Sequence, residues 1–174
     1  MKYLLVVLIG LGISTQAYSQ NLSFDQVLSL RKNNLAEVEE YLSTHGWSFL
    51  EGSAATDTTL ATATFTYKRS TYEDKAESFL LFVNSSDNSS NRLRIQVVKK
   101  DIYELYLARI KALGCKLIKS EIVDGGIVKV YQGATTTIKI SILTDKDEEY
   151  STKTIYNFFI AGNFDYAINF SDEE

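Results

Sequence analysis

The feature that most constrains the fold of this chain is a pattern of residues that recurs 68 positions further along the sequence. Residues 33–50 read NNLAEVEEYLSTHGWSFL and residues 100–118 read KDIYELYLARIKALGCKLI, with Gly46 in register with Gly114. Each copy carries an apolar stripe at helical spacing and stops at a glycine, which tolerates the left-handed backbone that often ends a helix. The stripes are Leu35, Val38, Leu42 and His45 in the first copy, and Tyr103, Tyr106, Ile110 and Leu113 in the second.

Capping signals mark where the helices are expected to begin. A cap residue followed three positions later by Glu or Gln allows two reciprocal hydrogen bonds at a helix N-terminus. This spacing occurs at Ser23 with Gln26, Asn34 with Glu37, and Asp101 with Glu104. The sequence therefore predicts one additional helix, over residues 24–32, before the two repeated ones.

Runs rich in β-branched and aromatic residues follow each repeated helix, and short turn-like segments separate them. We expect strands over residues 47–52, 62–69, 77–84 and 92–98 after the first helix, and over 115–122, 126–133, 136–143 and 154–161 after the second. The run FDYAINF (164–170) also alternates and predicts a further short strand.

These patterns predict an α+β protein built from two tandem repeats, each a helix plus a four-stranded antiparallel sheet, with the helices packed on one sheet face. Residues 1–19 are expected to be a signal peptide, 20–99 the first unit with two helices and four strands, and 100–174 the second unit with one helix and four or five strands. Whether the two sheets are continuous is left open.

This order of elements resembles the β-lactamase inhibitory protein architecture. The resemblance implies a concave sheet, made by tandem helix-plus-four-strand units, that grips a protein partner. It covers most of the chain but rests on the order of elements, and the single cysteine departs from the disulfides of that family. The resemblance assigns no role to any residue of this chain and names no target.

Alternation along the strands predicts which residues turn away from the helices. Ile138 and Ile140 are expected to face the helix, as are Val128 and Val130 on the preceding strand. The opposite, outer face is the candidate partner-binding face, and its predicted residues are Thr64, Thr66, Lys68, Arg92, Arg94, Gln96, Lys129, Tyr131, Lys139 and Ser141.

The N-terminus predicts export. Lys2 precedes an apolar run over residues 3–13, and Ala17-Tyr18-Ser19 has the small-x-small pattern of a cleavage site, so we expect a mature chain from Gln20 in the periplasm or outside the cell. No membrane span is expected after cleavage. The net charge of −4, without a basic cluster, argues against nucleic acid as a partner.

Residues that could carry chemistry are few. The chain has one histidine, His45, and one cysteine, Cys115, both at positions expected to pack at helix ends. A closed zinc site needs several such ligands, and no nucleotide-binding or nucleophile-elbow motif occurs. Asp145, Asp147 and Glu149 alternate as an EF-hand loop begins, but Tyr150 and Tyr156 stand where such a loop needs Gly and Glu. We therefore expect no enzyme activity, no cofactor and no metal site.

Three functions remain open at this point. The first is an exported binding module that engages an unknown protein partner through the outer sheet face. The second is a carrier of a small apolar ligand, because ESFLLFV and YNFFIAG are apolar on both alternations. The third is a structural or surface protein that associates through strand addition at a sheet edge.

Overall fold

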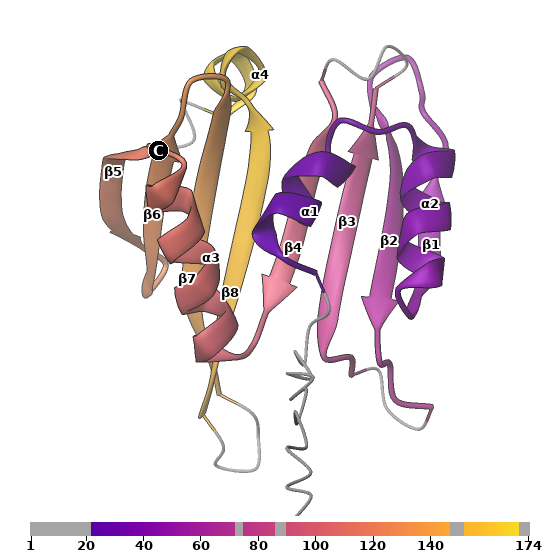
Figure 1. Ribbon diagram of the computed structural model, residues 1–174, viewed down its shortest axis with the longest axis horizontal. Coiled ribbons are helices and arrows are strands. Elements are labelled where there is room, and N and C mark those ends of the chain that lie inside the picture. The colour runs from indigo at the N-terminus through magenta and orange to yellow at the C-terminus, as the bar shows by residue number, and fades with distance from the viewer. Residues whose placement is uncertain (1–21, 72–74, 86–89, 147–151, 171–174) are drawn as a thin grey trace, which may run out of the picture.

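The chain folds around one sheet of eight antiparallel strands, in the order β1-β2-β3-β4-β8-β7-β6-β5 (Figure 1). The computed structural model describes residues 22–71, 75–85, 90–146 and 152–170, so the predicted signal peptide lies outside the described residues. The helices are α1 (Phe24–Leu30), α2 (Leu35–Thr44), α3 (Lys100–Ala112) and α4 (Asn163–Asn169). The strands are β1 (Trp47–Ser53), β2 (Ala61–Tyr67), β3 (Ser78–Asn84), β4 (Arg92–Val97), β5 (Lys116–Val123), β6 (Gly126–Gln132), β7 (Thr136–Lys146) and β8 (Thr152–Gly162).

The α+β class and the antiparallel sheet are confirmed. The continuity of the sheet, which the sequence left open, is now decided: there is one sheet of eight strands and not two sheets of four. The last strands of the two halves, β4 and β8, pair with each other, and Ile95 lies opposite Phe158 at the centre of this seam. Both side chains are fully buried. Because the seam pairs backbone with backbone, the eight strands form one continuous sheet.

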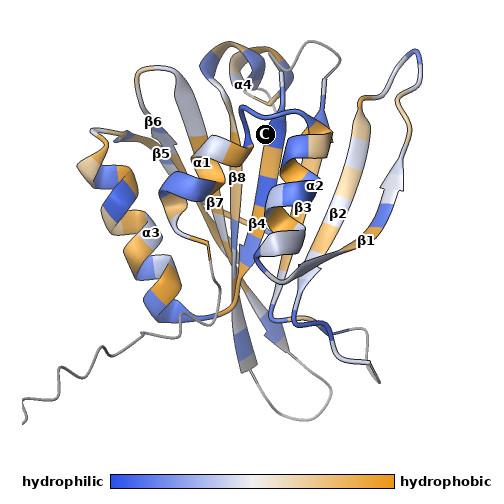
Figure 2. Cartoon of the chain, turned by 45° about the vertical axis from the view of Figure 1, so that its right-hand side comes forward, coloured by the Kyte–Doolittle hydropathy of each residue, from blue (hydrophilic) through white to orange (hydrophobic). Residues whose placement is uncertain are grey.

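Helices α1, α2 and α3 lie on the same face of the sheet (Figure 1). Apolar and polar residues alternate in bands along these helices, so each has one side suited to burial (Figure 2). Phe24 of α1, Tyr106 of α3 and Phe158 of β8 meet in this layer, with ring centroids 5.2 to 6.3 Å apart. We call the sheet face under these three helices the helix face, and the opposite face the outer face.

Two of the three predicted capping boxes are present. Ser23 and Gln26 exchange side-chain and backbone hydrogen bonds at the start of α1, and Asn34 and Glu37 do so at the start of α2. The predicted box at Asp101 is wrong, because α3 begins at Lys100 and its N-cap residue Lys99 makes no side-chain cap. Asp101 instead lies in the first turn, where a carboxylate is favoured by the helix dipole.

The predicted strand over residues 164–170 is also wrong, because this run forms α4. Its apolar residues satisfy a helical spacing as well as an alternating one: Tyr166 and Phe170 are four residues apart, and both pack against Phe159 on the outer face. This contact places α4 on the face opposite the other three helices.

Candidate functional site

The outer face is organised in rows of side chains that run across the strands. Directly opposed residues of antiparallel strands point to the same face, so the strand register assigns each side chain to a face. Arg94 of β4 lies opposite Phe159 of β8, which in turn lies opposite Lys139 of β7. The neighbouring row places Gln96, Asn157 and Ser141 side by side.

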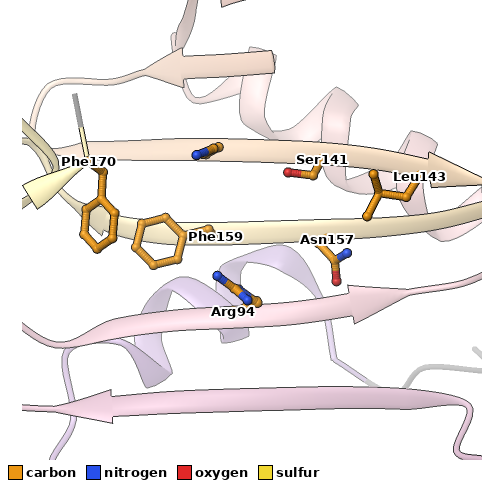
Figure 3. Close-up of a pocket in the computed structure, with 7 residues that line it drawn as sticks. Arg94, Ser141, Leu143, Asn157, Phe159 and Phe170 are labelled. Atoms are coloured by element: carbon orange, nitrogen blue, oxygen red, sulfur yellow. The ribbon is translucent and has the colours of Figure 1, made fainter. Parts of the chain in front are cut away.

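A pocket of about 250 Å3 lies over these two rows (Figure 3). Its lining residues are Arg94, Lys139, Ser141, Leu143, Asn157, Phe159 and Phe170. Arg94 is exposed, and within the described ranges it has no ion-pair or hydrogen-bond partner. The pocket therefore combines two cations, an aromatic floor and two short polar side chains, which suits an acidic group next to an apolar one.

Phe170, the C-cap residue of α4, forms one wall of this pocket. The ring of Phe170 lies 4.8 Å from that of Phe159, centroid to centroid, in an edge-to-face arrangement. The guanidinium of Arg92 lies over the ring of Phe170, 4.7 Å from its centroid. Nε and Nη2 of Arg92 also donate hydrogen bonds to the two carboxylate oxygens of Asp165, both at 2.8 Å. Arg92 shares the outer face with Arg94, as predicted, and there its side chain binds α4.

Strand β6 presents the opposite alternation from the predicted one. Tyr131 lies opposite Ile138 and Lys129 opposite Ile140, so both are on the helix face, and Tyr131 is buried in the core. Val128 and Val130 occupy the outer face instead, opposite Ser141 and Lys139. Both valines are buried there beside Tyr166 and Phe170. Because these rings cover them, the two valines can face away from the main core.

The remaining predicted residues are distributed over the first half of the sheet. Thr64 is half-buried on the outer face, and Thr66 is buried with its Oγ1 3.5 Å from the carbonyl oxygen of Ser48. Lys68 lies beyond the end of β2 in a left-handed conformation, with φ of 50°, and its Nζ is 3.5 Å from Glu77. The structure thus gathers Arg94, Gln96, Lys139 and Ser141 at the pocket region, whereas Lys68 lies outside the strands.

Two exposed apolar residues of α4 were missed by the sequence reasoning. Phe164 is 80% exposed and Ile168 is 62% exposed. They are four residues apart, so they share the side of α4 that faces away from Tyr166 and Phe170. A helical reading of residues 164–170 would have shown both pairs, because each pair has the same spacing.

His45 and Cys115 form no dyad. His45 stacks on Tyr41 with ring centroids 4.1 Å apart, and its Nδ1 lies 2.7 Å from the Tyr41 carbonyl oxygen, which fits a donating Nδ1. Cys115 packs against the core, and burial raises the pKa of its thiol. The two residues follow the C-terminal ends of α2 and α3, which lie at opposite ends of the sheet (Figure 1).

The part of the chain that the structure describes holds no group of three or more His, Cys, Asp or Glu residues arranged to bind a metal ion. None of the helices in the described ranges is long and apolar enough to cross a membrane. No protein-family model matches this chain, and comparisons with curated proteins and with solved structures also give no match.

Proposed function

We propose that this protein is a non-catalytic binding module that engages a protein partner through its outer sheet face. The observation that carries the proposal is the row in which Phe159 lies between Arg94 and Lys139, beside the wall made by Phe170. Aromatic side chains and arginine are the residues that contribute most often to the energy of protein–protein interfaces.

The exposed side of α4 extends this surface. Phe164 and Ile168 project from a helix that already rests on the outer face through Tyr166 and Phe170. An apolar pair that is open to solvent beside a cationic pocket is typical of an interaction surface with mixed chemistry. A partner that covered the pocket and this helix would bury both the aromatic floor and the apolar pair.

The proposal includes export to the periplasm or the cell exterior, for which the support is the signal-like sequence of residues 1–19. It also includes the tandem origin of the two halves. Two β-bulges support that origin, because the register shifts between Phe49 and Glu51 in β1 and between Leu117 and Lys119 in β5. These positions are 68 residues apart, like Gly46 and Gly114, both of which have φ near +78°. The likeness to the β-lactamase inhibitory protein architecture remains part of this proposal.

A carrier of a small apolar ligand is the alternative function. Phe79, Leu81 and Val83 give β3 an apolar outer side in addition to its buried helix-facing side. The two described pockets on the outer face, however, measure about 250 Å3 each, below the range of about 300 to 1,000 Å3 that is usual for ligand sites. Arg94 and Lys139 in the first pocket also suit an acidic partner group better than a wholly apolar ligand.

The test compares the wild-type protein with Arg94→Glu. Both are recovered from the native host and measured by native mass spectrometry, and the affinity for any co-recovered polypeptide is then determined with purified components. We expect Arg94→Glu to weaken that complex at least about tenfold, because a reversed charge faces the partner's acidic group.

Lys111→Glu is the matched control, because Lys111 is an exposed cation on α3, on the other side of the sheet. It should leave the complex unchanged. A partner that binds both variants as tightly as the wild type would place the site elsewhere. A co-purifying small molecule that organic solvent releases, with no second polypeptide, would instead support the carrier.

A further inference from the structure

Strand β5 forms one outer edge of the sheet and differs in character from the other edge. The sheet order leaves β5 with β6 as its neighbour, so the far side of its backbone faces away from the sheet (Figure 1). Half of its eight residues are large, exposed apolar residues, namely Leu117, Ile118, Ile122 and Val123. In β1, the opposite edge, Phe49 is the only residue of this kind. Long apolar edges of this type are templates for pairing with another strand.

Two charges of opposite sign flank Ser120 at the centre of β5. Lys119 and Glu121 flank Ser120, and their side chains form an ion pair of 3.1 Å along the strand. Lys119 lies opposite Val130 and Glu121 opposite Val128, so both charged residues are on the outer face. A second strand that ran antiparallel with its own Ser120 opposite this one would bring Lys119 against Glu121 and Glu121 against Lys119.

We infer that β5 is a homodimerisation edge, at which a second copy of this chain adds its own β5 in antiparallel register about Ser120. A two-fold axis at Ser120 makes each contact occur twice, as in other symmetric dimers. The two charge pairs would lie on the outer face of a sheet that runs through both copies. No residue of β5 lines the partner-binding pocket of the proposed function, although Lys119 and Glu121 line the neighbouring pocket, which shares Lys139 and Phe170 with it.

The apolar residues fit the same register. The bulge in β5 skips Ile118 in the pairing with β6, because Leu117 lies opposite Tyr131 and Lys119 opposite Val130. The same skip on the free side of β5 places Leu117 opposite Ile122 of the second copy. Both residues belong to the helix face, because Ile122 lies opposite Ile127, which is opposite Ile142. Pairing would cover Ile122, which is 81% exposed in the single chain.

Lysines and bulges on edge strands commonly discourage pairing with other chains. Whether β5 repels a second copy or pairs with it therefore depends on which charges lie opposite each other. A lysine opposite a lysine would repel a second copy. In this register each lysine meets a carboxylate, and opposite-charge cross-strand pairs are stabilising. The complementarity is to β5 itself, and this favours a second copy over an unrelated strand.

The test uses two charge-reversal variants. Each is expected to weaken the dimer when it is alone, and a mixture of the two is expected to restore it. In Lys119→Glu two carboxylates would face each other, and in Glu121→Lys two ammonium groups would do so. Sedimentation velocity from about 1 to 100 μM should show a dimer for the wild-type protein and raise the dimer Kd at least about tenfold for each variant. An equimolar mixture of the two variants should restore the dimer, because each contact then pairs opposite charges.

The mixture separates the proposal from a change within one chain, since both variants lose the Lys119–Glu121 ion pair and only the interface pairs are rebuilt. Arg94→Glu should dimerise like the wild type, which keeps this test independent of the proposed partner site. A wild-type protein that stays monomeric across the range would overturn the inference. Single variants that dimerise normally, or a mixture that stays monomeric, would overturn it as well.

Discussion

The guanidinium of Arg92 and the carboxylate of Asp165 form a bidentate ion pair that joins β4 to α4. Nε and Nη2 of Arg92 each lie 2.8 Å from one carboxylate oxygen, and Nδ2 of Asn169 donates a third hydrogen bond at 2.9 Å. The Asp165 side chain is 6% exposed. A buried carboxylate is tolerated when its charge is paired and its oxygens are satisfied, and here both conditions hold. The position of the pocket wall therefore depends on this pair.

Replacement of Arg92 by methionine should destabilise the protein by about 3 kcal/mol, because the buried Asp165 carboxylate loses the guanidinium that pairs with both of its oxygens. Replacement of Arg94 by methionine should change the free energy of unfolding by less than about 0.5 kcal/mol, because Arg94 is exposed on the same strand. Urea denaturation of the two variants measures both values. Equal losses in the two variants would show that the ion pair does not hold α4.

Most of the secondary structure follows from local patterns in the sequence. The capping boxes of α1 and α2 and the glycines that end α2 and α3 are short-range signals, and the strands follow runs of β-branched and aromatic residues. The seam between β4 and β8 has no such signal, because Ile95 and Phe158 are far apart in the sequence and each merely looks like a buried strand residue. Whether the halves join is a matter of long-range pairing.

The faces of the strands were less predictable than the strands themselves. Alternation divides β6 into Val128 with Val130 and Lys129 with Tyr131, but it does not say which pair meets the helices. Apolar content favoured the valines, and this was wrong because α4 residues cover the outer side of β6. This error and the strand wrongly predicted over residues 164–170 have the same cause, because both come from missing α4. Without this helix, nothing would cover the valines on the outer face.

Tyr106 should make the protein less stable at alkaline pH. Its hydroxyl donates a hydrogen bond of 2.8 Å to the carbonyl oxygen of Leu22, and burial raises the pKa of the phenol well above its ordinary value of 10.0. Above that ordinary pKa the unfolded chain loses the proton while the folded chain keeps it. The unfolded state then binds fewer protons, so stability falls as pH rises, by about 1.4 kcal/mol per pH unit.

Tyr106→Phe removes this titration and the hydrogen bond together. At pH 8 the variant should be about 1 kcal/mol less stable than the wild type, which is the usual net value of a buried hydrogen bond. Near pH 11 this difference should vanish. About one pH unit above the ordinary pKa of tyrosine, the wild type has lost about as much stability as its hydrogen bond contributes. Urea unfolding at both pH values measures the difference. Parallel curves for the two proteins would rule out ionisation of Tyr106 as the cause of any alkaline loss.

Sγ of Cys115, the residue shortly before β5, lies close to Gly133, which follows β6. A Cβ added at Gly133 would lie 2.9 Å from Sγ of Cys115, which is closer than such atoms approach in proteins. Gly133→Ala should therefore destabilise the protein by about 1 kcal/mol, the lower end of the cost of overpacking, because a thiol at the end of a short side chain can shift. Thermal unfolding of the variant measures this cost.

Cys115→Ala provides the matched background, because it removes the atom that the new methyl group would meet. In this background Gly133→Ala should cost nothing further, and the coupling energy of the double-mutant cycle should equal the cost of the single change. A cost that persists without the thiol would show that the backbone at Gly133, and not the contact with Cys115, requires glycine.

The continuous sheet predicts that both halves unfold together. Trp47, the single tryptophan, starts the edge strand β1 and reports the first half by fluorescence, whereas far-ultraviolet circular dichroism reports the whole chain. Phe158→Ala in β8 should lower stability by about 3 to 5 kcal/mol through the cavity it leaves among Phe24, Tyr106 and Ile95. Because the backbone pairing at the seam couples the halves, the Trp47 transition should move by the same amount as the circular dichroism transition. A Trp47 transition that stays in place while the circular dichroism shifts would show that the first half folds independently of the seam.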